Sequence, residues 1–158
     1  MIKIKPFTKN KIKDALKIIE IAFGKNEAKA AKCWFYLNKK LESTVLHSAK
    51  RFLAIENSKV VGICGFYSWR QHLKDVAWLG WFAVLPEYRN KRIGSKLLKH
   101  TLDYTRKKGY RIFCIETTNH KDQLEARKLY QSFGFRKNGQ IPGFWGNYDI
   151  LFLSKKLK

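Results

Sequence analysis

Residues 79–98 constrain the fold more than any other stretch, because a buried strand leads there directly into an amphipathic helix. The strand is predicted to end near Val84, Pro86 interrupts it, and a short basic turn precedes the helix. A turn of this kind directs several free backbone N–H groups and the positive end of a helix dipole at one point. The stretch is therefore a candidate site for an anion such as pyrophosphate.

Basic residues in the turn support this interpretation. Arg89, Lys91 and Arg92 add positive charge, and Gly94 leaves space for a ligand to approach the backbone. The spacing fits neither a Walker A loop, which needs Gly-x-x-x-x-Gly-Lys-Ser/Thr, nor a Rossmann fingerprint, which needs three glycines. An ordinary strand–turn–helix with a solvated basic turn is the alternative.

The same stretch resembles the acetyl-CoA motif of the GNAT superfamily of N-acetyltransferases, Val-x-Pro-x-x-Arg/Gln-x-x-Gly-x-Gly/Ala. Val84, Pro86, Arg89 and Gly94 match the pattern, and Arg92 replaces the first glycine of the pair. A side chain at that position would either crowd a phosphate or clamp it.

Residues 125–135 resemble the other GNAT motif, Ala-x-x-Leu-Tyr-x-x-x-Gly-Phe. The two motifs stand in the superfamily's order with one predicted strand between them, which is much more specific than either motif alone. The resemblance covers roughly the second half of the chain and identifies it as a member of the superfamily. The element order predicted for the first half is compatible with this.

With 158 residues the chain suits one domain, predicted to span residues 1–158. The resemblance implies an α/β (α+β) fold with a mixed central sheet of about six to seven strands, about four flanking helices and splayed central parallel strands. Periodicity places strands near 2–5, 52–55, 60–69, 75–84, 111–117, 135–137 and 148–153, and helices near 9–22, 27–41, 93–107 and 124–133. Thr8 is expected to cap the first helix, and Gly109 and Gly134 to end the last two. Gly62 and Gly65 suggest a bulge or a close contact within a strand.

Charge and cysteine content bear on partners and compartment. The chain has 33 Lys and Arg against 12 Asp and Glu, a net charge of +21, which suits nucleic acid, an anionic membrane surface or an anionic cofactor such as coenzyme A. A lysine-biased composition explains the charge equally well, because the lysines are spread along the chain. Cys33, Cys64 and Cys114 form no Cys-x-x-Cys motif and are interpreted as small buried residues in a reducing compartment. No signal peptide or membrane span is predicted, so we expect a cytoplasmic protein without membrane partners. The four histidines lack metal-ligand spacing, so no metal is expected.

The resemblance implies that acetyl-CoA lies between the splayed strands, with the backbone of Phe82 and Val84 bonding its pantetheine arm. The pyrophosphate would rest on the turn, with Ser95 at the helix start. Gln123 stands where the family often has an asparagine for this arm, and Asn119 is the alternative. The residues expected to bind the cofactor are Phe82, Ala83, Val84, Arg89, Asn90, Lys91, Arg92, Ile93, Gly94, Ser95, Asn119, Gln123 and Tyr130.

For catalysis, the resemblance implies direct attack of an amine on the thioester. Tyr130 matches the tyrosine that protonates the departing thiolate, and packing within its helix is the alternative role. Many relatives carry a glutamate base where this chain has Trp78, whereas Glu116 matches a base on the following strand. Glu116 is either that base or the partner of a cation, and the sequence leaves both open.

The acceptor is expected to be a primary amine of a small molecule or a peptide, bound by a monomer or a homodimer. The net charge disfavours polyamines and basic peptides unless a local acidic pocket offsets it, so an acidic or neutral amine is mildly favoured. Glu87, Glu116 and Asp149 are the candidates for such a pocket. Several aromatic residues near the expected cleft either cage an amine or form core: Trp69, Trp78, Trp81, Phe144, Trp145 and Tyr148. The competing hypothesis is a basic RNA- or ribosome-binding module with a degenerate cofactor site, for which nucleic acid is a possible but not favoured partner.

Overall fold

The computed structural model describes residues 1–36, 46–72 and 75–157. Its helices are α1 Ile12–Phe23, α2 Lys25–Tyr36, α4 Ile93–Lys107 and α5 Leu124–Ser132. Its strands are β1 Lys3–Pro6, β2 Leu46–Glu56, β3 Lys59–Trp69, β4 Val76–Leu79, β5 Ala83–Val84, β6 Ile112–Thr118, β7 Arg136–Trp145 and β8 Tyr148–Lys156. Short 3-10 turns occur at Lys9–Lys11, Arg70–His72, Pro86–Tyr88 and Lys121–Gln123.

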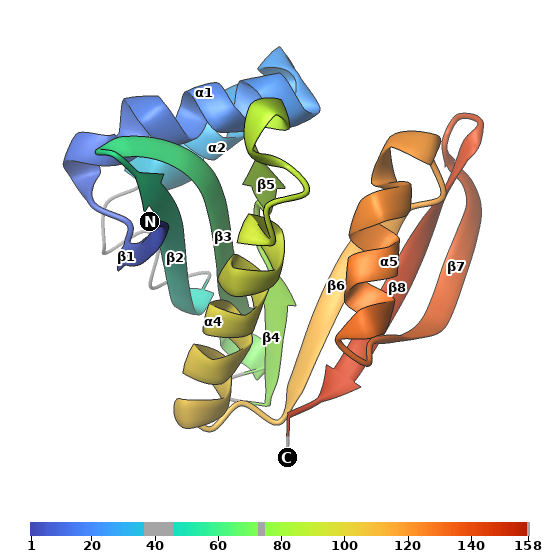
Figure 1. The fold of residues 1–158 in the computed structure, drawn as a ribbon. Coiled ribbons are helices and arrows are strands. Elements are labelled where there is room, and N and C mark those ends of the chain that lie inside the picture. The colour runs from blue at the N-terminus through green and yellow to red at the C-terminus, as the bar shows by residue number, and fades with distance from the viewer. Residues whose placement is uncertain (37–45, 73–74, 158) are drawn as a thin grey trace.

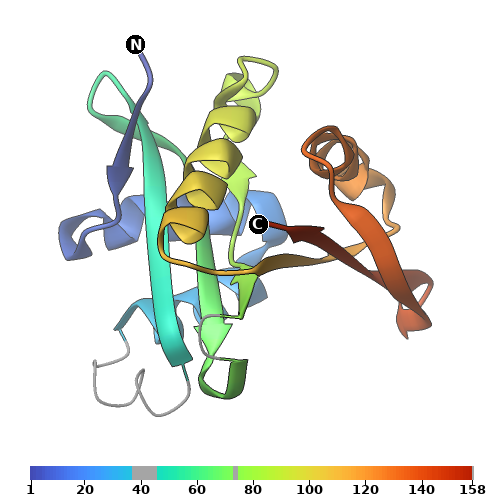
Figure 2. The same cartoon turned by 90° about the horizontal axis from the view of Figure 1, so that it is seen from below.

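The strands form one mixed sheet with helices on both faces, which confirms the predicted α/β class. Within the described residues the sheet has eight strands in the order β1-β2-β3-β4-β6-β8-β7, with β5 paired to β3, where about six to seven were expected. Figures 1 and 2 show α1 and α2 over one end of the sheet, α4 across β2 and β3, and α5 beside β6 and β8.

The central strands separate along their length. The parallel pairing of β4 with β6, predicted from the strand–helix–strand order, covers only residues 76–78 and 112–114. Beyond it β5 pairs with β3 alone, and β6 continues to Thr118 against β8 alone. In Figure 1, β6 runs away from β4 and β5 above this point. The predicted splay is present.

The continuous strand predicted over residues 75–84 is wrong, because residues 80–82 interrupt it. The Gly80 N–H still donates to the carbonyl of Gly65 on β3, at 2.9 Å. A Cβ on Gly62 would lie 3.0 Å from the Ala83 carbonyl oxygen, so that glycine allows β5 to approach β3. The register of β2 against β3 also shifts beside Gly62, which fits the predicted bulge or close contact.

The loop predicted between 137 and 148 is also wrong, because most of it belongs to β7, which pairs with β8 as a hairpin. β7 lies at the edge of the sheet, where a proline such as Pro142 costs no hydrogen bond to a further strand. The register shift between Ile141 and Trp145 accommodates the irregular segment that contains Gly143.

Helix ends follow the glycines, as predicted, but not the expected cap. Gly109 and Gly134 have φ of +90° and +82° and follow α4 and α5. Thr8 makes no side-chain capping bond; its hydroxyl donates to Asn10 Oδ1 at 2.5 Å, so the capping prediction is wrong. α2 begins directly after Gly24, and the part of its prediction covering 37–41 lies outside the described residues.

Two layers of core flank the sheet. One joins α1 and α2 to β2 and β3, and the other joins α4 and α5 to the opposite face. Cys64 is buried in the second, which raises the pKa of its thiol to about 12. Cys114 is half-buried and Cys33 is exposed, so the prediction of burial is wrong for Cys33. None of the helices in the described ranges has the length and hydropathy needed to cross a membrane.

Candidate active site

A cavity of about 660 Å³ lies where β4 and β5 part from β6. Its walls come from α1 and α2, from β2 and the end of β3, from the 80–82 interruption, and from the end of β6. The 3-10 turn before α5, Tyr130 of α5 and the β7–β8 hairpin complete them. Four of the predicted site residues line it: Phe82, Glu116, Gln123 and Tyr130. Segments far apart in the sequence therefore meet at the point where the sheet opens.

The turn before α4 presents free backbone donors, as predicted. Arg92 is the N-cap of α4, and the first intrahelical bond runs from the Lys96 N–H to the Arg92 carbonyl at 3.1 Å. The N–H groups of Ile93, Gly94 and Ser95 thus have no intrahelical acceptor, no side chain caps them, and the first turn contains no acidic residue. This arrangement suits an anion.

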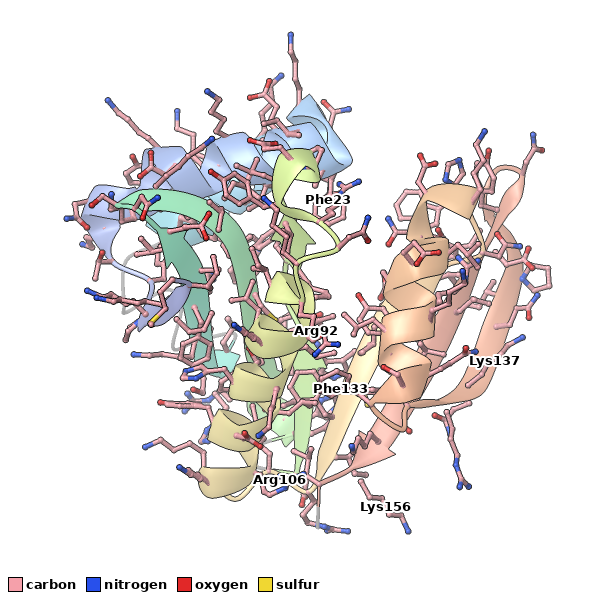
Figure 3. All side chains as sticks on the ribbon, viewed as in Figure 1. Phe23, Arg92, Arg106, Phe133, Lys137 and Lys156 are labelled. Carbon is pink, nitrogen blue, oxygen red and sulfur yellow. The ribbon has the colours of Figure 1, made fainter. Side chains whose placement is uncertain are left out.

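The backbone at Arg92 explains why glycine is common at this position of the motif. Its φ is +58°, in the left-handed region that glycine adopts without strain. Asn90 also has a positive φ, of +60°. Figure 3 shows Arg92 at the start of α4, on the side of the helix that faces α5. Lys91 instead places its Nζ 5.0 Å from the centroid of the Tyr88 ring.

Arg89 and Gly94 each have a second structural role. The Arg89 Nε donates to the Val84 carbonyl oxygen at 3.2 Å, which ties the turn to the end of β5 and leaves the other guanidinium donors for a ligand. A Cβ on Gly94 would lie 3.3 Å from Phe82 Cζ, so the glycine accommodates the Phe82 ring as well as any ligand. Ala83 is buried opposite Ile63.

Tyr130 and Thr117 lie on the side of the sheet that α4 and α5 cover. Tyr130 is only 4% exposed, its ring lies against Phe82 and Phe135, and burial raises the pKa of its hydroxyl. Thr117 was not predicted as a site residue. Its hydroxyl oxygen is buried without a hydrogen-bond partner and the residue lines the cavity. An orphaned buried hydroxyl here fits a site that a polar chain such as pantetheine completes.

Glu116 lies on the opposite face, because successive strand residues alternate. Its carboxylate is in none of the ion pairs found among the described residues, so the cation-partner alternative receives no support there. Removal of water by the surrounding protein raises its pKa, although the side chain is still exposed to the cavity. Tyr67 is close by, and burial followed by the charge of Glu116 raises its pKa to about 12.

Of the two residues considered for the pantetheine arm, Gln123 lines the cavity and Asn119 does not. The Asn119 side-chain oxygen accepts the Asp149 N–H at 2.9 Å, and its own N–H donates to the Asp149 carbonyl at 3.2 Å. These bonds join the end of β6 to the start of β8. Asn119 therefore supports the cavity wall.

The structure also revises which aromatic and acidic residues surround the cavity. Of the predicted aromatic residues, Trp78 and Phe144 do not line it. Three aromatic residues outside that set do line it: Phe23, Trp34 and Tyr67. Of the predicted acids, Glu87 pairs with Lys59 at 3.3 Å and Asp149 accepts the Gly143 N–H; neither lines the cavity. Glu27 and Asp122, which the sequence did not single out, do line it. Glu27 accepts a hydrogen bond from Trp81, which is 54 residues away in the sequence, so no local pattern marks it as a cavity residue.

No cluster of three or more His, Cys, Asp or Glu side chains suited to a metal ion occurs in the described parts of the chain. The acetyl-CoA expected from the two motifs does fit: the donors at α4, the splayed strands and the Thr117 hydroxyl all adjoin the 80–94 stretch or the cavity.

Comparison with known proteins agrees with this geometry. The sequence model of the acetyltransferase (GNAT) family matches residues 16–135. The Xenopus laevis protein named probable N-acetyltransferase camello is 38% identical over 95 residues, which are 60% of this chain and 42% of that protein. The chain thus spans less than half the length of this relative.

Solved structures share the fold over the whole chain. An N-acetyltransferase from Staphylococcus aureus Mu50 has a TM-score of 0.80 at 21% identity, covering 100% of this chain and 99% of that one. An aminoglycoside 6′-N-acetyltransferase complexed with coenzyme A has a TM-score of 0.78 at 14% identity, covering 99% and 97%. The fold and the family expected from the two motifs are therefore confirmed, and the chain belongs to the GNAT acetyltransferase family.

Proposed function

We propose that the protein is an N-acetyltransferase that moves the acetyl group of acetyl-CoA to a primary amine of a small molecule. The observation that carries this is the position of Glu116 and Tyr130, which line one cavity from opposite faces of the opened sheet. An acid and a base on opposite faces of the sheet, beside the strand gap, suit a reaction in which one proton leaves the amine and another reaches the leaving sulfur.

The cofactor would lie along the edges of β5 and β6 that face the gap, which pair with no other strand within the described residues. Between them, the 80–84 segment and residues 115–118 of β6 offer backbone donors and acceptors to the two amides of pantetheine. A pantetheine amide would be the hydrogen-bond partner that the Thr117 hydroxyl lacks, and Gln123 would add a second polar side chain. The pyrophosphate would rest on the N–H groups of Ile93–Ser95, with Arg92 beside it.

The transfer needs a neutral amine. Glu116 would accept a proton from the amine, directly or through water, as the nitrogen attacks the thioester carbonyl carbon. The C–N bond forms, the C–S bond breaks, and Tyr130 donates its hydroxyl proton to the departing sulfur. Glu116 then releases its proton to solvent and Tyr130 regains one, so the products are an acetamide and the coenzyme A thiol. No enzyme nucleophile takes part.

Calorimetric titration with acetyl-CoA tests the cofactor site. The wild type should bind, and Arg89→Ala should weaken binding about tenfold, because one charge-assisted contact and the tie to Val84 are lost. Arg111→Ala is the matched control, since Arg111 pairs with Asp75 at the other end of β6. Absence of binding at millimolar acetyl-CoA would overturn the proposal.

A further inference from the structure

The charge of the cavity is opposite to that of the whole protein. The described residues that line it include three carboxylates (Glu27, Glu116 and Asp122) and one guanidinium, that of Arg51. The chain as a whole has a net charge of +21. Such a reversal concentrates negative potential at the one place where an acceptor would bind.

We propose that the acceptor is a small organic dication, in which one amine is acetylated and a second cationic group is bound by Glu27. This inference rests on the proposed acetyl transfer. It reverses the expectation from net charge, which favoured an acidic or neutral amine only in the absence of a local acidic pocket.

Glu27 is held in place by an unusual partner. It lies in the first turn of α2, and its Oε2 accepts a hydrogen bond from Trp81 Nε1 at 3.2 Å. Trp81 belongs to the interruption between β4 and β5, and its ring meets the buried Phe35 edge-on, with centroids 5.6 Å apart. A neutral indole donor orients the carboxylate without cancelling its charge, so the carboxylate remains able to bind a cation.

The lining also suits the body of such a molecule. Tyr67 and Trp69 on β3 lie edge to face, with centroids 5.2 Å apart, and Trp34 on α2 lines the same cavity. Aromatic faces attract ammonium groups and pack against the methylene chain between them. Phe23, at the end of α1 (Figure 3), lines the same cavity.

The one guanidinium among the described lining residues is stacked on a ring. The Arg51 guanidinium carbon lies 4.9 Å from the centroid of Phe35. Asp122 Oδ2 lies 3.5 Å from His120 Nδ1, so Glu27 and Glu116 are the lining carboxylates without an ion pair among the described residues. The overall positive charge is spread over the surface, where salt screens it over about 8–10 Å, whereas these two carboxylates belong to the cavity wall itself. A dication is therefore favoured over a zwitterion, whose carboxylate would be repelled by those of Glu27 and Glu116.

Equilibrium binding of three amines of matched length tests the proposal: 1,5-diaminopentane, 1-aminopentane and 5-aminopentanoate. They share one primary amine and differ only in whether the far end is positive, neutral or negative. Dissociation constants would be measured by calorimetry with and without coenzyme A. Coenzyme A is used in place of acetyl-CoA because it has no acetyl group to transfer, so no turnover occurs. We expect the diamine to bind about tenfold tighter than the monoamine, and 5-aminopentanoate to bind most weakly.

Two variants assign the effect. Glu27→Gln keeps an oxygen for the Trp81 donor and should bring the diamine to within about twofold of the monoamine. Glu87→Gln is the matched control, because Glu87 is a comparably accessible carboxylate, paired with Lys59, that does not line the cavity; it should leave the preference unchanged.

The proposal is overturned if the monoamine binds as tightly as the diamine, if none of the three binds at millimolar concentration, or if Glu27→Gln keeps the preference. Tighter binding of 5-aminopentanoate would overturn it in favour of carboxylate recognition by Arg51. The acetyl-CoA titration distinguishes failure of this inference from failure of the proposed acetyl transfer. If acetyl-CoA binds but the protein does not select a dication, only the dication inference is rejected.

Discussion

The ring centroids of Phe82 and Tyr130 lie 6.1 Å apart, with the two planes inclined by 44°. Phe82 belongs to the interruption between β4 and β5, and Tyr130 to α5, which packs beyond β6. The contact therefore bridges the two halves of the opened sheet and holds the tyrosine ring in the cavity wall. Gly94 completes this arrangement, because a larger residue would press on Phe82.

Replacing Tyr130 by Phe should lower kcat about a hundredfold, because the leaving sulfur loses its proton donor. The ring contacts with Phe82 and Phe135 remain, so acetyl-CoA affinity and thermal stability should stay close to wild type. Steady-state kinetics and calorimetry measure both. Tyr110→Phe is the matched control, since Tyr110 is equally buried but lies outside the cavity. An unchanged kcat in Tyr130→Phe would assign the residue to packing.

The rate should depend on pH through Glu116. Desolvation raises its pKa above the ordinary 4.5, and the carboxylate acts as a base only when ionised. The value of kcat/KM should therefore rise with pH through this raised pKa, with a further rise where the acceptor amine loses its proton. Glu116→Gln should abolish the first rise and keep the second. Tyr130 contributes to neither rise, because its pKa lies above the ordinary 10.0 and its hydroxyl stays protonated over this range.

The same shift predicts an effect on stability. A carboxyl whose pKa is raised by folding favours the folded state while it is protonated, below pH 4.5, and loses that contribution as pH rises through the folded-state pKa. Glu116→Gln should therefore be more stable than wild type near neutral pH, and the difference should vanish below pH 4.5. Urea unfolding at the two pH values measures it; a difference that does not change with pH would contradict the desolvation of Glu116.

Thr117→Val should separate stability from binding. Valine removes a buried hydroxyl that has no partner, so the free energy of unfolding without ligand should increase by about 1 kcal/mol. Acetyl-CoA should bind about tenfold more weakly, because the hydroxyl no longer bonds the cofactor. Thr117→Ser keeps the hydroxyl and should keep the affinity. Wild-type affinity in Thr117→Val would show that the hydroxyl does not contact the cofactor.

Local signals predicted the turn before α4, the glycines that end helices and the parallel partners β4 and β6. The features that sequence missed depend on distant contacts. Trp81 and Phe82 are apolar and favour strands, so their residue types do not mark the interruption between β4 and β5.

The same reasoning applies at the edge of the sheet and in the cavity. Gly139, Pro142 and Gly143 favour a loop, but pairing with β8 overrides that preference over much of β7. The role of Glu27 follows from a partner 54 residues away, which no periodicity reveals. Tyr130 and Glu116 were predicted as site residues only because the family resemblance pointed to them.

The substitution of Arg92 for the usual glycine is open to a paired test. The φ of +58° strains any residue with a Cβ, so Arg92→Gly should be about 1 kcal/mol more stable than Arg92→Ala, although neither has the guanidinium. Urea unfolding measures this difference. If the guanidinium clamps the pyrophosphate, both variants should bind acetyl-CoA about tenfold more weakly than wild type; tighter binding in both would show that the side chain crowds the site instead. Arg106→Ala is the control, because Arg106 lies at the opposite end of α4 (Figure 3) and should leave the affinity unchanged.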